Sequence, residues 1–386
     1  MRSTDRAATL ASVVVLTGVQ GIAPALPEIR DVFGLNDSGA SLLTLGYLLA
    51  AFGAGPLAAL ADRLGERLVL VASLVVFGLA GGVVTVAPDF TVLIAARTVQ
   101  GAAFGVVMAI TIGLMGKGLD LVPLARAHGV RVIAMAMAEV VLPLAVGALL
   151  EVASWRAAAA LQMAALPVAI YCAWVLPHPG PDEPRVAERE RGMRPALSAL
   201  ATPFGVAVQV PGFARFLLKF AMLTYWPLLA ADAYGMSAWS IGLALSASAV
   251  ASILAAWAAP SLIGRYNTAQ ASLVGLLLAA VPFVLLPVAT SSTHFVLLIL
   301  ITGAGEGVLG VANNVSASEA APEVGRSAFF GLTGTIRNLG RFSGLAILGG
   351  LTLMAPLAGA LALVGVLGIV SAAAVPVMAR GLPPPE

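Results

Sequence analysis

Charged residues are scarce in this sequence: they make up 10% of its 386 residues, whereas a soluble domain carries about 25%. Hydrophobic residues make up 60% of the chain. Because so few charges cannot cover a water-facing surface, we expect lipid rather than water around most of the chain. The net charge of only +2 gives no reason to expect a nucleic-acid partner.

Several kinds of functional site are missing from the sequence. A single cysteine, Cys172, cannot form a disulfide framework. There is no phosphate-binding Gly-Lys-Ser/Thr loop for ATP, the three histidines are too scattered for a metal site, and no Ser/His/Asp arrangement suggests a hydrolase. We therefore expect no enzyme activity, no cofactor and no bound metal.

Long apolar segments fill the chain instead. A helix needs roughly 20 mostly apolar residues to span a bilayer, and the first segment lacks a signal-peptide cleavage pattern. The sequence predicts an all-α membrane protein with twelve spans, at 8–28, 39–61, 67–87, 91–115, 128–150, 156–177, 211–232, 238–263, 268–290, 295–316, 328–352 and 356–378. A charged, proline-rich linker at 178–205 separates a bundle at 1–177 from a second at 206–386.

The distribution of lysine and arginine predicts the orientation of these spans. If the N-terminus is inside, the inner loops and tails hold fourteen of the 21 basic residues, and the outer loops hold only Arg30 and Arg156. Cytoplasmic loops carry the excess of positive charge. Both termini are therefore predicted to face the cytoplasm, which requires an even number of spans.

The loop between the second and third spans carries Asp62, Arg63, Gly65 and Arg67. A carboxylate at a helix end, beside a tight glycine turn and arginines, can latch neighbouring helices together. This pattern resembles the loop signature of the major facilitator superfamily, although Glu66 stands where that family usually has a basic residue. The resemblance implies that these four residues form a conformational latch on the cytoplasmic side.

Two further elements extend the resemblance. In the fourth span, Arg97, Gln100 and Gly101 are similar to the family's Arg-x-x-Gln-Gly element, which is associated with proton coupling. In the fifth span, Pro143 and Gly147 are similar to part of the family's exporter signature, from which other glycines are missing. The resemblance implies two six-helix bundles around a central cavity lined by spans 1, 4, 7 and 10.

Ionisable residues within the spans are functional candidates, because charge at bilayer depth is costly. Counting about 1.5 Å of rise per residue places Glu139 within reach of Arg97, and Glu306 at the depth of Arg341. A carboxylate near an arginine and alternately wetted from two sides can carry a proton. These four residues are the proton-coupling candidates, and permanent ion pairs between helices are the alternative.

Other polar and aromatic residues could line the cavity. Lys219 would favour an anionic substrate if it faces the cavity, whereas Arg215 is expected to extend to the cytoplasmic interface. Buried helix-to-helix hydrogen bonds or an interfacial aromatic belt are the alternative roles. The cavity candidates are Gln20, Gln100, Lys219, Tyr225, Trp226, Asn313 and Asn314.

Three functions remain open at this point. The first is a secondary transporter working by alternating access, with proton-coupled efflux of small amphipathic or hydrophobic organic compounds. The second is proton-linked uptake of a small organic anion or nutrient, and the third is a non-transporting membrane scaffold or sensor. The expected partners are a small-molecule substrate, protons and the lipid bilayer. We expect a monomer that crosses the bacterial inner (plasma) membrane many times.

Overall fold

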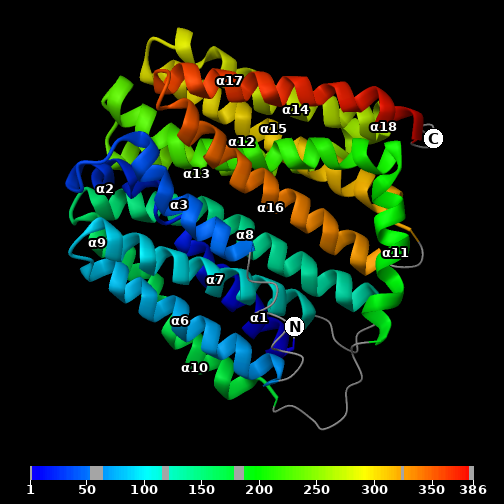
Figure 1. Ribbon diagram of the computed structural model, residues 1–386, viewed down its shortest axis with the longest axis horizontal. Helices are drawn as coiled ribbons and strands as arrows, with labels where there is room; N and C mark the ends of the chain where they lie inside the picture. The colour runs from blue at the N-terminus through cyan, green and yellow to red at the C-terminus, as the bar shows by residue number, and fades with distance from the viewer. Residues whose placement is uncertain (1, 53–63, 115–120, 178–186, 323–325, 382–386) are drawn as a thin grey trace. The chain divides into compact units, whose positions relative to one another are not determined.

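The computed structural model describes residues 2–52, 64–114, 121–177, 187–322 and 326–381, and every regular element in these ranges is helical. The helices divide into two compact units (Figure 1). The first consists of Met1–Glu183 and Gly235–Ser246, and the second of Pro184–Tyr234 and Ala247–Glu386. Two of the predicted latch residues, Asp62 and Arg63, lie outside the described residues.

Ten helical segments of the described ranges are long and apolar enough to cross a membrane. Of the remaining predicted spans, one coincides with the shorter apolar helix α3 and one with α16, which carries Arg337 and Arg341. An all-helical membrane protein is therefore confirmed.

Within the described residues, the first unit is built from eight α-helices together with the first turns of α13. In it, α7 packs against both α3 and α6, and α10 packs against α6 and α1 (Figure 1). Its helices are α1 (Ser3–Val14), α2 (Leu26–Val32), α3 (Asp37–Phe52), α6 (Glu66–Val86), α7 (Phe90–Leu114), α8 (Leu121–Leu150), α9 (Trp155–Ala160) and α10 (Ala165–Val175).

The second unit pairs α12 with α15 and α16, and α14 with α15 and α17. The linker helix α11 packs against α16 and α12. Its helices are α11 (Ala187–Ala201), α12 (Pro203–Tyr234), α13 (Ala238–Arg265, shared with the first unit), α14 (Thr268–Leu285), α15 (Ser292–Ala320), α16 (Arg326–Leu351), α17 (Leu357–Val370) and α18 (Val375–Gly381).

The first membrane segment is interrupted near its middle. Between α1 and α2 the chain forms a 3₁₀ turn (Val15–Gly18), an irregular turn and a second 3₁₀ turn (Ala23–Ala25). Gly21 and Pro24 lie in this region, and proline cannot donate the hydrogen bond that an α-helix requires. Lipid offers no water to satisfy carbonyl groups released by such a break, so other helices have to supply donors.

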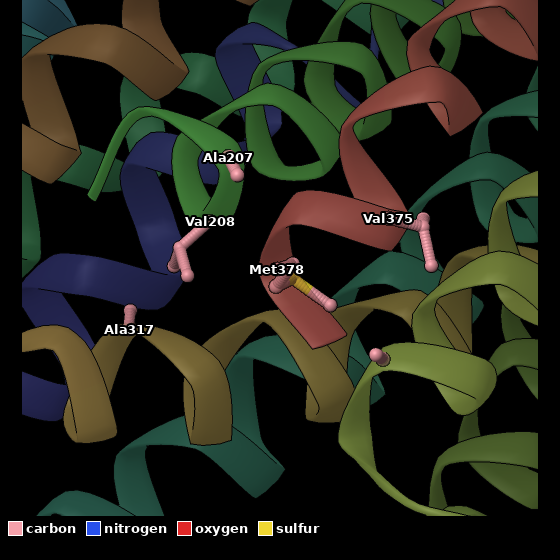
Figure 2. Close-up of a cluster of buried hydrophobic side chains, with 6 residues drawn as sticks. Ala207, Val208, Ala317, Val375 and Met378 are labelled. Carbon is pink, nitrogen blue, oxygen red and sulfur yellow. The ribbon is translucent and has the colours of Figure 1, made fainter. Parts of the chain in front are cut away.

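A cluster of small and apolar side chains fixes the beginning of α12 in the second unit (Figure 2). It joins α12 to α14, α15 and α18 through Ala207, Val208, Ala269, Ala317, Val375 and Met378. Because lipid is as apolar as these side chains, close van der Waals packing rather than the hydrophobic effect stabilises such contacts. The small alanines allow the helix backbones to approach, which places the polar residues that follow on α12.

Gly101 is the position where α7 comes closest to α3. A Cβ atom added at Gly101 would lie 1.9 Å from the carbonyl oxygen of Tyr47, so only glycine fits without moving the backbone. Gly331 on α16 provides a contrast, because nothing lies within 4 Å of a Cβ atom built there.

We therefore expect opposite effects from the same substitution at these two glycines. Gly101→Ala should lower the free energy of unfolding by about 1–3 kcal/mol through overpacking. Gly331→Ala should leave stability unchanged or raise it by up to about 1 kcal/mol, since alanine is the better helix former. Thermal unfolding of the two purified variants measures both, and equal melting temperatures would contradict the close approach of α7 and α3.

Candidate functional site

Arg97 is the centre of a buried polar network in the first unit. Its side chain is fully buried, and Nη2 donates to the carbonyl oxygen of Gly18 at 2.6 Å. This carbonyl lies at the interruption of the first membrane segment. Nη1 donates to Oε1 of Gln100 at 3.0 Å, and the guanidinium lies 4.3 Å from the ring centroid of Tyr47. Arg97 therefore donates a charge-assisted hydrogen bond to a carbonyl group of the interrupted segment.

Gln100 continues this network to two more elements. Its Nε2 atom donates to the carbonyl oxygen of Phe77 on α6 at 3.2 Å and to Oε1 of Gln162 at 2.5 Å. Gln162 lies in the 3₁₀ turn Leu161–Ala164 that links α9 to α10. The Arg97, Gln100 and Gly101 element thus connects five membrane segments, and its described hydrogen-bond acceptors are neutral.

Glu306 on α15 is the centre of a charged network in the second unit. Its Oε1 atom lies 2.5 Å from Nη2 of Arg215 and 3.3 Å from Nζ of Lys219. Ser252 on α13 donates its hydroxyl to Oε2 at 2.8 Å. Arg215 and Lys219 are four residues apart on α12 and so share one helix face. Each side chain of the two ion pairs is less than one-fifth exposed.

Close packing of α13 against α15 makes the contact between Ser252 and Glu306 possible. A Cβ atom added at Gly307, the residue after Glu306, would lie 2.1 Å from the carbonyl oxygen of Ser252. Glycine at this position lets the two backbones approach closely. The serine hydroxyl can then reach a carboxylate on the neighbouring helix.

Two arginines of α16 extend the charged network. The guanidinium of Arg341 lies 4.6 Å from the ring centroid of Phe216, and that of Arg215 lies 4.9 Å from the same centroid. Nη1 of Arg341 also donates to Oδ1 of Asn338 at 2.9 Å.

Arg337 is anchored to α15 by amides. Its Nη2 atom donates to Oδ1 of Asn313 and of Asn314, both at 2.9 Å. The amide of Asn313 in turn donates to the carbonyl oxygen of Val208 at 2.9 Å. We refer to Arg215, Lys219, Glu306, Arg337 and Arg341 as the basic cluster; it contains four cationic side chains and one carboxylate.

Arg215 and Ser252 are the members of this site that sequence reasoning missed. The sequence places Arg215 at the cytoplasmic interface, because it predicts a seventh span that begins at residue 211. The helix α12 begins at Pro203 instead, so Arg215 lies about 18 Å from the start of the helix at 1.5 Å per residue. The signal that could have located it is the four-residue spacing to Lys219.

The remaining cavity candidates of the second unit are buried in packing contacts. Tyr225 and Trp226 are fully buried. The hydroxyl of Tyr225 donates to the carbonyl oxygen of Leu345 at 3.3 Å. The ring centroid of Trp226 lies 5.0 Å from that of Phe283 and 5.4 Å from that of Phe295.

Four other candidates lie in the first unit. Gln20 is buried in the irregular turn between α1 and α2, and Glu139 is half-buried on α8. Pro143 and Gly147 lie where α8 meets the first turns of α13: a Cβ atom added at Gly147 would lie 3.2 Å from the Cα atom of Gly242. The exporter-like remnant thus coincides with a tight helix crossing.

The described part of the predicted latch makes a contact with a different helix. Gly65 precedes α6 with a positive φ of 88°, a conformation that favours glycine. Nη2 of Arg67 donates to the carbonyl oxygen of Ala173 on α10. Arg67 therefore ties α6 to α10 near the beginning of the third predicted span.

The Gln100–Gln162 hydrogen bond generates a stability prediction. Gln162→Leu should lower the free energy of unfolding by about 1 kcal/mol, because the buried Gln100 amide loses an acceptor. Gln270→Leu is the control, since that glutamine is exposed. Unfolding of the purified proteins gives the comparison, and a Gln162→Leu variant as stable as the control would show that the hydrogen bond contributes nothing.

Comparison with known proteins assigns the chain to a family. The family model of the Major Facilitator Superfamily matches residues 8–345. The quinolone resistance protein NorA of Staphylococcus aureus (strain Mu50) is 29% identical over 111 residues, which are 28% of this chain and 28% of NorA. A triacylglyceride transporter of Mycobacteroides abscessus is 36% identical over 80 residues, which are 20% of this chain and 15% of that protein.

Solved structures share the whole fold at low sequence identity. A bacterial homologue of the human lysosomal transporter Spinster, in an inward-facing and unoccupied conformation, has a TM-score of 0.74 at 16% identity, covering 98% of this chain and 94% of that one. A POT family transporter in complex with a thioalcohol-conjugated peptide has a TM-score of 0.78 at 12% identity, covering 98% and 95%. This chain belongs to the Major Facilitator Superfamily, a family of transporters and not of enzymes.

Proposed function

We propose that this chain is a proton-coupled secondary transporter working by alternating access, with Glu306 as the carboxylate that binds the proton. The observation that carries the proposal is the position of Glu306 within the second unit, bonded to two cations and a serine. An ionisable residue that is buried among the helices of a membrane protein is by default a functional candidate.

Protonation of Glu306 would change the forces between three helices. In the ionised state the carboxylate attracts Arg215 and Lys219 on α12 and accepts from Ser252 on α13. A bound proton removes the negative charge and leaves the two cations to repel each other. A bound proton would therefore shift the equilibrium of the packing of α15 against α12 and α13.

Export of small amphipathic or hydrophobic organic compounds is the direction supported by the comparisons. The 111-residue similarity to NorA, a quinolone resistance protein, is one support. The partial exporter signature at Pro143 and Gly147 is the other.

Uptake of a small organic anion is the second candidate, and the basic cluster favours it. Arg337 is held there by the neutral amides of Asn313 and Asn314. A guanidinium group held by neutral partners attracts an anion and repels a cation.

The proposed arrangement in the membrane follows from the loop charges. We propose twelve spans, bundles at 1–177 and 206–386, both termini in the cytoplasm and a monomer in a bacterial inner membrane. The support is the excess of basic residues in the loops assigned to the inside. Labelling of single cysteines placed in each loop of intact cells, in a Cys172→Ser background, tests the arrangement; a cysteine near Arg265 that reacts from the outside would contradict it.

Neutralising Glu306 should separate proton coupling from substrate movement. In proteoliposomes, Glu306→Gln should abolish transport driven by a pH gradient but retain exchange of substrate across the membrane, because the glutamine cannot bind and release a proton. Asp31→Asn is the control, since Asp31 is an exposed carboxylate. Glu139→Gln tests the second proton-coupling candidate in the same assay.

Two outcomes would contradict the proposal. Flux that responds to the pH gradient as strongly in Glu306→Gln as in the unaltered protein would remove Glu306 from the mechanism, and normal coupling in the Glu139→Gln variant as well would remove the proton mechanism. Absence of any flux of every compound tested would favour the non-transporting scaffold or sensor instead.

A further inference from the structure

A pocket lies in the second unit between α11, α12 and α16. Its volume is about 310 Å³, and ligand pockets in proteins range from about 300 to 1,000 Å³. The residues that line it are Leu200, Val206, Gln209, Val210, Phe213 and Ile336. The pocket is therefore large enough for a compound of one or two rings.

The pocket lies where α12 and α16 separate from a close contact. A Cβ atom added at Gly340 of α16 would lie 2.4 Å from the carbonyl oxygen of Phe213 on α12, so the two backbones touch there. The pocket occupies the stretch before this contact, beginning at Val206 on α12 and including Ile336 on α16. The linker helix α11 crosses both helices near their beginnings and closes the gap with Leu200 (Figure 1).

Uncharged side chains line the whole pocket. Four of them, at 206, 209, 210 and 213, share one face of α12, and all but Gln209 are apolar. A charged group buried among these residues would find no partner, and an unpaired buried charge is costly. The lining therefore favours an uncharged compound.

Gln209 gives the pocket one directed polar group. Its side chain is 5% exposed, and its Nε2 atom finds no hydrogen-bond partner within the described ranges. Buried amide donors are nearly always paired, because an unsatisfied donor loses the hydrogen bond that it makes to water in the unfolded chain. A carbonyl or ether oxygen of a ligand would supply the missing acceptor.

We infer that this pocket binds a small uncharged organic compound that carries an acceptor oxygen, with its rings between the three helices and its oxygen accepting from Gln209. The site is separate from Glu306 and its ion pairs, because Arg215 and Lys219 lie on a different face of α12. The inference therefore goes beyond the proposed proton coupling. A phospholipid is the poorer occupant, since its headgroup is charged and its two acyl chains exceed the pocket.

Benzophenone tests the inference, because it is a small uncharged ketone with two rings that inserts into neighbouring C–H bonds under ultraviolet light. The full-length protein in nanodiscs of zwitterionic lipid is irradiated with it, and mass spectrometry locates the labelled residues. Labelling should be saturable and should concentrate on the residues that line the pocket. Labelling that rises linearly with concentration, or spreads over the exposed apolar surfaces, would overturn the inference.

Competition for this labelling tests the chemistry of the ligand. 2-Acetonaphthone and 2-ethylnaphthalene share their rings, and only the ketone has an acceptor oxygen. Gln209→Leu should weaken competition by the ketone about fivefold, the loss of one hydrogen bond, and leave competition by the hydrocarbon unchanged. Comparing each compound between the two proteins cancels its partition into lipid. An equal effect on both compounds would contradict the hydrogen bond from Gln209.

Two charged analogues test the preference for an uncharged compound. Naphthalene-2-carboxylate and 2-naphthylmethylammonium should each compete at least about tenfold less well than 2-acetonaphthone, because no lining residue can pair with their charge. Competition by either of them at the level of the ketone would overturn the proposed ligand class.

A further variant locates the site. Val210→Phe should fill the pocket and abolish the labelling, whereas Val370→Phe, on an exposed part of α17, should not. Unchanged labelling in a Val210→Phe protein that unfolds at the normal temperature would contradict the site. A phospholipid that copurifies with the unaltered protein and is lost from Val210→Phe would identify a lipid as the occupant and overturn the inference. Glu306→Gln should be labelled like the unaltered protein, so failure of the proton proposal leaves these tests valid.

Discussion

A buried charge in a membrane protein needs partners within the protein, and two residues of this chain, Arg97 and Glu306, find such partners on other segments. Arg97 bonds the carbonyl of Gly18, where the first membrane segment is interrupted. Glu306 bonds side chains on α12 and α13. Water cannot replace these partners in lipid, so the positions of whole helices follow from a few polar atoms.

The two networks differ in their capacity to respond to a proton. The described hydrogen-bond acceptors of Arg97 are a backbone carbonyl and an amide, neither of which gains or loses a proton in the physiological range. Glu306, in contrast, is titratable, and its charge determines whether two cations are attracted or left to repel each other. Among the described residues, the network around Glu306 therefore contains a titratable hydrogen-bond acceptor, whereas the acceptors of Arg97 are neutral.

Sequence reasoning reached the helical membrane fold and the family, because apolar length and local motifs carry that information. It also singled out Glu306 from its cost in lipid. It missed Arg215, because it predicts a span that begins at residue 211, whereas α12 begins at Pro203. It missed Gln162 and Ser252 as well, because uncharged polar residues are common in membrane helices and only the rotation of a helix about its axis shows which of them face a partner.

The charge of the substrate would also determine the direction of coupled transport. Arg215 and Lys219 are held by Glu306 in its ionised state. An anion that attracts these cations weakens their hold on the carboxylate and adds negative charge nearby, and both effects favour the protonated form of Glu306. By reciprocity, protonation then favours binding of the anion. Proton and anion would therefore cross the membrane together, whereas a cationic substrate near the same carboxylate would compete with the proton and be exchanged for it.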